Sequence, residues 1–118
     1  MQRTAVHPYL DSGLSFVAEE DGEIYGFLFA QMLHHIADCD NLLWIENMGV
    51  DPVVRRNEIG CRLLRECLRA GRGQGAQVAH SMIGQDNAPS IMLHKKIGFF
   101  MDRRNVALLD LTDPKLRL

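Results

Sequence analysis

The stretch MGVDPVVRRNEIGCRLL, residues 48–64, decides the fold, because the spacing of its apolar residues changes within it. Its first residues end an apolar run, Leu42–Val50, which is typical of a β-strand and is closed by Asp51. From Gly60 onward, apolar residues recur at steps of three and four, the period of a helix with one buried face. The stretch therefore predicts a strand, a short loop and an amphipathic helix that ends near Gly71.

The loop in this stretch has the chemistry of an anion site. Arg55 and Arg56 lie in it, and the helix opens between Asn57 and Gly60. The first turn of a helix carries unpaired backbone N–H groups and a partial positive charge, and arginines add charge-assisted hydrogen bonds suited to a diphosphate. The alternative is a solvated arginine pair at an ordinary helix start, and these residues alone leave both possibilities open.

The other segments predict further strands and a second helix. Asp21 and Gly22 form a hairpin signal, and Asn87 and Gly98 are suited to the start and end of a helix that runs to about Lys96. The predicted strands are Leu14–Glu19, Ile24–Leu33, Leu42–Val50, Ala76–Ile83, Phe99–Asp102 and Asn105–Leu111, with a polar loop over His35–Asn41 and an irregular segment over residues 1–13.

This order, βββ-α-β-α-ββ, predicts an α/β (mixed α+β) fold. We expect a mixed, mostly antiparallel sheet of about six strands with two main helices, in a single domain over residues 1–118.

Composition excludes several classes of protein. The 118 residues are 47% hydrophobic and 24% charged, as in an ordinary globular domain, and the net charge of −2 disfavours a nucleic-acid partner. No apolar run approaches the roughly 18 residues that a membrane helix needs. Three cysteines without a C-x-x-C motif predict reduced thiols in a cytoplasmic protein.

Three stretches resemble the GNAT acetyltransferases. VDPVVRRNEIGCRLL (50–64) resembles their acetyl-CoA motif, V-x-P-x-x-R/Q-x-x-G-x-G/A, and NAPSIMLHKKIGFF (87–100) resembles their second motif, N-x-x-A-x-x-L-Y-x-K-x-G-F. FVAEEDGEIYGFLFA (16–30) looks like the family's hairpin. Two motifs in the matching strand–helix order are more specific than one. The resemblance covers about residues 14–111 and implies a GNAT-like fold with acetyl-CoA as cosubstrate and no metal.

In the family, backbone amides of the first motif wrap the coenzyme's pyrophosphate, which implies a binding site around the start of the first helix. Glu58 stands where the family has its first glycine, and only Gly60 is kept. We expect Glu58 to point away from the phosphates, paired with Arg62 four residues on. The residues that the resemblance assigns to coenzyme binding are Met48, Gly49, Val50, Arg55, Arg56, Asn57, Glu58, Ile59, Gly60, Cys61, Asn87 and Ser90.

Two residues are candidates for catalysis. His94 replaces the family's tyrosine, which is thought to protonate the leaving thiolate, and a histidine titrates in the range that this needs. Glu46 is the candidate general base, expected on the same strand face as Met48, with Asn47 on the other. Backbone N–H groups over Met48–Val50 would polarise the thioester carbonyl. A half-exposed helix histidine and a strand glutamate paired with arginine are the structural alternatives.

His34, His35, Asp38, Cys39 and Asp40 also crowd together. Their spacing fits no standard zinc pattern, so we expect a polar loop and no metal.

The leading hypothesis is an N-acetyltransferase that transfers the acetyl group of acetyl-CoA to a primary amine by direct attack. The acceptor is a small molecule or a protein amine. Thirteen residues precede Leu14, fewer than the family's usual leading strand and two helices, so we expect an open acceptor site or one completed in a homodimer. The alternatives are a non-catalytic acyl-CoA-binding or regulatory module of the same fold, and an interaction module without coenzyme.

Overall fold

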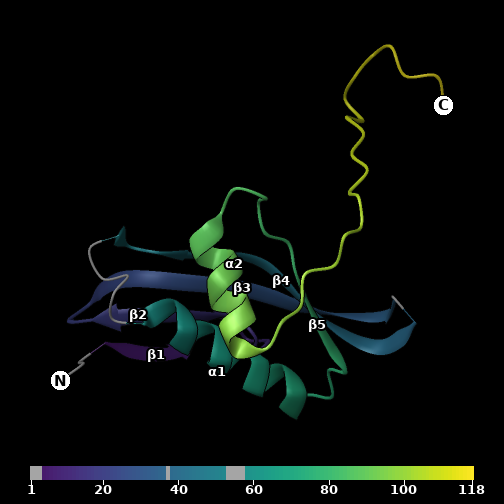
Figure 1. Ribbon diagram of the computed structural model, residues 1–118. Coiled ribbons are helices and arrows are strands. Elements are labelled where there is room, and N and C mark those ends of the chain that lie inside the picture. The colour runs from purple at the N-terminus through teal and green to yellow at the C-terminus, as the bar shows by residue number, and fades with distance from the viewer. Residues whose placement is uncertain (1–3, 37, 53–57) are drawn as a thin grey trace.

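The computed structural model describes residues 4–36, 38–52 and 58–118 and places both helices on one face of a single sheet (Figure 1). The five strands have the spatial order β1-β2-β3-β4-β5; the first four are antiparallel, and β5 is parallel to β4. The elements are β1 Ala5–Pro8, β2 Phe16–Glu20, β3 Glu23–Ile36, β4 Cys39–Val50, α1 Ile59–Gly73, β5 Val78–Ser81 and α2 Ala88–Ile97.

The β2–β3 hairpin forms as the sequence predicts, and the β3–β4 pairing extends further than expected. Asp21 and Gly22 both have positive φ, 51° and 82°, which suits a two-residue turn between twisted strands. The long pair β3–β4 reaches from Gly26↔Val50 to Ile36↔Cys39. The expected loop over His35–Asn41 is therefore wrong in extent, because strand pairing continues through most of its polar residues.

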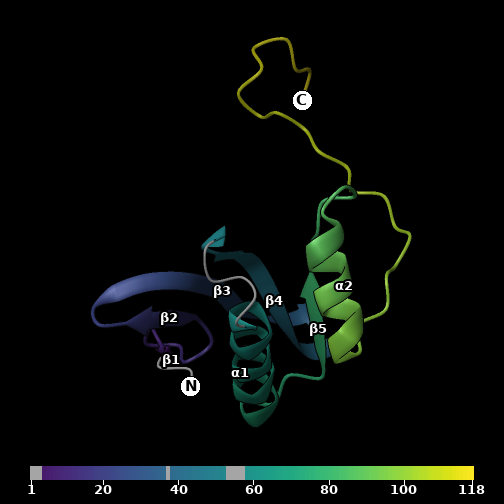
Figure 2. The same cartoon turned by 60° about the vertical axis from the view of Figure 1, so that its left-hand side comes forward.

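Two further expectations are corrected at the ends of the chain. Residues 1–13 are not wholly irregular, because β1 pairs with β2 from Ala5↔Glu19 to Pro8↔Phe16. Proline is tolerated there because β1 is an edge strand. The strands expected over Phe99–Asp102 and Asn105–Leu111 do not form, because the described residues after α2 hold no strand. The first of these residues pass beside β5, and the later ones extend away from the sheet (Figure 2). Alternation of apolar residues creates a strand only where a neighbouring strand supplies the hydrogen bonds.

Helix α1 covers the sheet with the face that the sequence predicts. Its buried residues include Leu63, Leu64 and Cys67, whereas Arg65 and Arg69 are exposed. Two glycines allow close contact: a Cβ on Gly26 would lie 3.0 Å from the Leu63 side chain, and one on Gly71 would lie 2.6 Å from that of Leu43. The core cluster is Leu14, Phe16, Ala18, Leu28, Ala30, Leu43, Ile45, Ile59, Leu63, Leu64 and Cys67.

Helix α2 is bounded as expected. The Asn87 side chain accepts a hydrogen bond from the Ser90 N–H at 3.3 Å, and Gly98 follows the helix with φ 129°. Only His94 of this helix is buried. Within the part of the chain that the structure describes, no helix is long and apolar enough to cross a membrane.

Candidate active site

Strands β4 and β5 part next to an irregularity in β4. Their pairing ends at Ile45↔Ser81, where β5 stops, while β4 continues to Val50. On its other side β4 pairs Asn47 with Phe29 and Ile45 with Ala30, so Glu46 is an extra, bulged residue. Bulges of this kind re-aim side chains and end pairing next to active sites.

The bulge changes which face of the sheet each β4 side chain occupies. Ile45 is a core residue and Met48 packs against the core, so both lie on the helix-covered face although three positions separate them. The expectation that Glu46 shares a face with Met48 is therefore wrong. Glu46 is exposed and accepts a hydrogen bond from the Gln31 side-chain amide at 2.9 Å, on the face without helices.

The start of α1 lies beside the end of β4. Arg55, Arg56 and Asn57, which the resemblance assigns to coenzyme binding, lie outside the described residues. Glu58 is described: it precedes the helix in the left-handed conformation, φ 58° and ψ 27°. Glycine adopts that conformation without a steric penalty, which explains why the family motif has glycine at this position.

The Glu58 carboxylate forms an ion pair with a residue of α2. Lys96 donates a hydrogen bond to it at 2.9 Å, which lowers the pKa of Glu58 and raises the pKa of Lys96. The expected partner, Arg62, instead donates to the Thr4 carbonyl at 2.7 Å. The carboxylate therefore already has a cationic partner, and the choice of Arg62 was wrong because the α1–α2 packing is not visible in a local i,i+4 pattern.

The remaining predicted coenzyme residues have clear structural settings. The side chains of Ile59 and Cys61 are buried, so these residues offer a ligand only their backbone. A Cβ on Gly60 would lie 3.2 Å from Leu93, so this glycine lets α1 approach α2. Gly49 lies under Phe27, whose ring would be 2.7 Å from a Cβ there.

His94 is buried in a hydrogen-bonded setting. Its side chain is 1% exposed, with Nε2 2.9 Å from the Ser81 hydroxyl and Nδ1 2.7 Å from the Ser90 carbonyl oxygen. The Phe99 ring packs edge-on against the imidazole at 4.8 Å. The structural alternative of a half-exposed helix histidine is therefore wrong. The polar neighbour of His94 on β5 is Ser81, which no sequence pattern marks.

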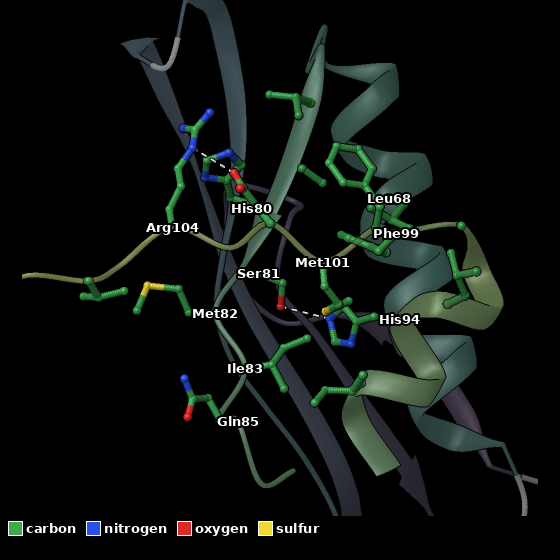
Figure 3. Close-up of a pocket in the computed structure, with 18 residues that line it drawn as sticks. Leu68, His80, Ser81, Met82, Ile83, Gln85, His94, Phe99, Met101 and Arg104 are labelled. Carbon is green, nitrogen blue, oxygen red and sulfur yellow. Dashed lines mark hydrogen bonds and ion pairs between the residues drawn. The ribbon is translucent and has the colours of Figure 1, made fainter. Parts of the chain in front are cut away.

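A cavity of about 730 Å³ lies between β5, α2 and the chain that follows α2 (Figure 3). Ser81 and His94 line it together with apolar side chains such as Ile83, Phe99 and Met101. Of the predicted coenzyme residues that the structure describes, none lines this cavity.

The two catalytic candidates thus lie on opposite faces of the sheet, at the same place along it. Glu46 follows Ile45, the strand partner of Ser81, and lies on the helix-free face. His94 touches Ser81 from the helix-covered face. The structure brings these groups to the point where β4 and β5 part.

The cluster of histidine, aspartate and cysteine residues between His34 and Asp40 was also tested as a metal site. Among the residues that the structure describes, no group of three metal-binding side chains was found. The His34 ring bonds to Asn41 at 2.8 Å, and His35 lies 3.8 Å from Asp40.

Comparison with known proteins identifies the family. Residues 2–118 match the family described as "Protein of unknown function (DUF1999)". The chain belongs to this family. The DUF1999 chain is also 27% identical over 92 residues, 78% of its length, to the mycothiol acetyltransferase of Streptomyces coelicolor, of which it covers 28%. It is 28% identical over 88 residues, 72% of its length, to an aminoglycoside N(6')-acetyltransferase type 1 of Salmonella typhimurium, of which it covers 61%.

Solved structures agree on the fold. The aminoglycoside N-acetyltransferase AAC(6')-Iy in complex with CoA superposes on the DUF1999 chain with a TM-score of 0.73 and 26% identity, over 81% of this chain and 74% of the other. A putative acetyl transferase from Pyrococcus furiosus gives a TM-score of 0.70 at 22% identity, over 81% and 63%. The GNAT resemblance and the mixed sheet with two helices are confirmed. The chain spans between 28% and 61% of the lengths of these curated relatives.

Proposed function

We propose that this chain is an N-acetyltransferase domain that transfers the acetyl group of acetyl-CoA to a primary amine. The observation that carries the proposal is the parting of β4 from β5 beside the start of α1, in a fold similar to an acetyltransferase structure that contains CoA. A helix start next to an open strand end is a favourable place for a phosphate group.

The residues present fit such a coenzyme. The backbone amides of Ile59, Gly60 and Cys61 belong to the first turn of α1, and the bond from Lys96 already occupies the Glu58 carboxylate. Gly49 and Val50 end β4 beside that turn. Bound acetyl-CoA supplies the activated acetyl group. We assign the pyrophosphate to the α1 turn and the thioester to the parting of β4 and β5.

Glu46 is the general base of this proposal. A carboxylate at a β-bulge, exposed on the helix-free face, is reachable by an amine that approaches from that side. His94 is the source of the acid proton on the opposite face, so the proton lost by the amine and the proton gained by the leaving sulfur follow separate routes. Asn87 caps α2 and Ser90 positions His94, which makes both structural supports of the site.

The acceptor is a small-molecule amine. One named relative is an aminoglycoside N(6')-acetyltransferase and another is a mycothiol acetyltransferase, and one neighbouring structure contains the bisubstrate analogue CoA-S-monomethyl-acetylneamine. The open helix-free face, with Glu46 on it, leaves room for a bulky amine.

We also propose a cytoplasmic homodimer. The three free cysteines suit a reducing compartment. Apolar side chains in the chain after α2 are between 58% and 89% exposed, as a protein–protein contact requires: Val106, Leu108, Leu109 and Leu111.

Calorimetric titration with acetyl-CoA and release of CoA thiol across a panel of amines test the function. The panel holds an aminoglycoside, an alkylamine, an amino acid and a lysine peptide. We expect micromolar binding and amine-dependent thiol release, with Glu46→Gln changing the pH–rate profile more than the affinity. Binding without thiol release would favour the non-catalytic acyl-CoA-binding module, and a folded chain that binds no coenzyme would overturn the proposal.

A further inference from the structure

His94 cannot meet a substrate directly. Its ring is 1% exposed, and both nitrogens are engaged, one with the Ser90 carbonyl and the other with the Ser81 hydroxyl. A carbonyl oxygen only accepts hydrogen bonds, so Nδ1 carries a proton in either charge state of the ring. Any proton that His94 exchanges with its surroundings must therefore pass through Nε2.

Ser81 is the group at that exit. Its hydroxyl lies 2.9 Å from Nε2, and the side chain lines the cavity that His94 also borders (Figure 3). Ser81 is the last residue of β5 and pairs with Ile45, immediately before the Glu46 bulge. It thus lies at the parting of the strands, where the proposed function places the thioester.

The charge state of His94 decides which way the Ser81 proton points. A neutral ring offers a lone pair on Nε2, which the Ser81 O–H fills. A protonated ring donates from Nε2 to the serine oxygen, and the hydroxyl proton must then turn toward another acceptor. The cavity is the open direction, because Ser81 is only partly buried.

The geometry points to Ser81 as the catalytic acid of the acetyl transfer, with His94 as the residue that reloads it. This inference rests on the proposed function and names its proton path. As the carbon–sulfur bond breaks, the sulfur keeps the bonding electron pair and takes the Ser81 hydroxyl proton. The serine oxygen takes the Nε2 proton of His94 in the same step. The proton that the amine releases to Glu46 and solvent balances the one consumed.

The decisive variant is Ser81→Ala, measured with acetyl-CoA and an amine found in the panel. We expect kcat to fall by about 100-fold or more with little change in KM, as loss of a general acid does. Ser81→Thr keeps a hydroxyl and should restore most of kcat. Because the two groups act as a unit, Ser81→Ala combined with His94→Phe should be little slower than either alone.

A second acetyl donor distinguishes the loss of an acid from a structural defect in Ser81→Ala. An aryl thioacetate releases a thiolate that needs no proton, so Ser81→Ala should slow this donor less than about tenfold. Ser15→Ala is the matched control: Ser15 is a buried serine that bonds to the backbone of Ala30 and does not line the cavity. Its activity loss, if any, should be the same for both donors.

Any of three outcomes would overturn the inference. The first is an unchanged kcat in Ser81→Ala, and the second is an equal loss of rate with acetyl-CoA and with the aryl thioacetate. The third is a Ser81→Thr variant that is as stable as the wild type in urea and still does not regain kcat. If the wild-type chain binds acetyl-CoA and releases no thiol with any amine, the proposed function itself has failed. If the wild type is active and Ser81→Ala has the same kcat, only the proton relay is contradicted and the proposed function stands.

Discussion

Glu58 occupies a backbone conformation that a glycine would hold more easily. Its φ of 58° lies in the left-handed region, and its side chain forms an exposed ion pair with Lys96, a described residue of α2. We predict that Glu58→Gly raises the midpoint of urea unfolding, because relief of the steric penalty exceeds the loss of that pair.

Glu58→Gln is the control, since it removes the charge and keeps the strained backbone. It should lower the midpoint slightly, and only where the carboxylate is ionised: Lys96 lowers the pKa of Glu58 below its usual value, so the pair contributes above about pH 4.5 and is lost as the pH falls through the lowered pKa. Destabilisation by the glycine variant would show that the ion pair dominates.

The three thiols differ in burial, which predicts their reactivity. Cys67 is fully buried, and burial raises its pKa to about 12, which disfavours the reactive thiolate near pH 8. Cys61 is also buried, whereas Cys39 is partly exposed. With an aromatic disulfide reagent, native protein should release one equivalent quickly and the other two only on unfolding. Fast reaction of two or three thiols would contradict the core placement of α1.

At the scale of elements, α1 packs on the sheet through the missing side chain of Gly71. A Cβ there would lie 2.6 Å from the Leu43 side chain, which is itself buried. We predict that Gly71→Ala destabilises the fold relative to Gly73→Ala by about 1–3 kcal/mol, the usual cost of overpacking. Gly73 ends the same helix with nothing within 4 Å, so its alanine variant carries only the gain in helix propensity. Equal urea midpoints would mean that Leu43 moves aside freely.

The pairing of β1 with β2 should depend on pH. His7 bonds through its ring to the Pro8 carbonyl and to the Glu19 carboxylate, and these two contacts, the first being the larger, raise the pKa of His7 above 6.5. A raised pKa means stabilisation that is complete below about pH 6.5 and is lost as the pH rises through the folded-state pKa. Amide hydrogen exchange of β1, corrected for intrinsic rates, should therefore become less protected on going from about pH 6 to about pH 9. His7→Asn should show no such change, and an equal change in that variant would assign the effect to another group.

The sequence predicted elements whose signals are local. The turn at Asp21 and Gly22, the buried face of α1 and the Asn87 cap all depend on residues within one or two turns of each other, and each is confirmed. The features that it missed depend on distant partners. Strand β1 exists because β2 pairs with it, and the Glu46 bulge exists because β3 and β4 differ by one residue across Phe29 and Ala30.

The same distinction applies to the site. The position of His94 within a family motif was visible in the sequence. Its burial and its hydrogen bond to Ser81, thirteen positions earlier, depend on the packing of α2 against β5. No residue pattern around Ser81 marks it, so only the folded chain could single it out.

The molecule as a whole is elongated by the chain after α2. Its largest dimension is 57 Å against 31 and 27 Å for the other two, and the C-terminal chain leaves the sheet in both views (Figures 1 and 2). Apolar side chains on this chain have no cover within the described residues of a single copy: Leu108 is 89% exposed and Leu111 is 73% exposed. Because removal of apolar surface from water is worth about 25 cal/mol per Å², a second copy that covers them is the simplest source of stabilisation.

We therefore predict a dimer of about twice 13.3 kDa in sedimentation velocity, and a shift toward monomer in the double variant Leu108→Asp with Leu111→Asp. Met92→Asp is the matched control, since Met92 is 70% exposed on α2 and lies outside the chain that follows it. The control should remain a dimer, because one charge on a helix surface disrupts no shared apolar contact. A wild-type chain that sediments as a monomer at micromolar concentration would contradict the proposed homodimer, and dissociation of the Met92 variant alone would move the contact to α2.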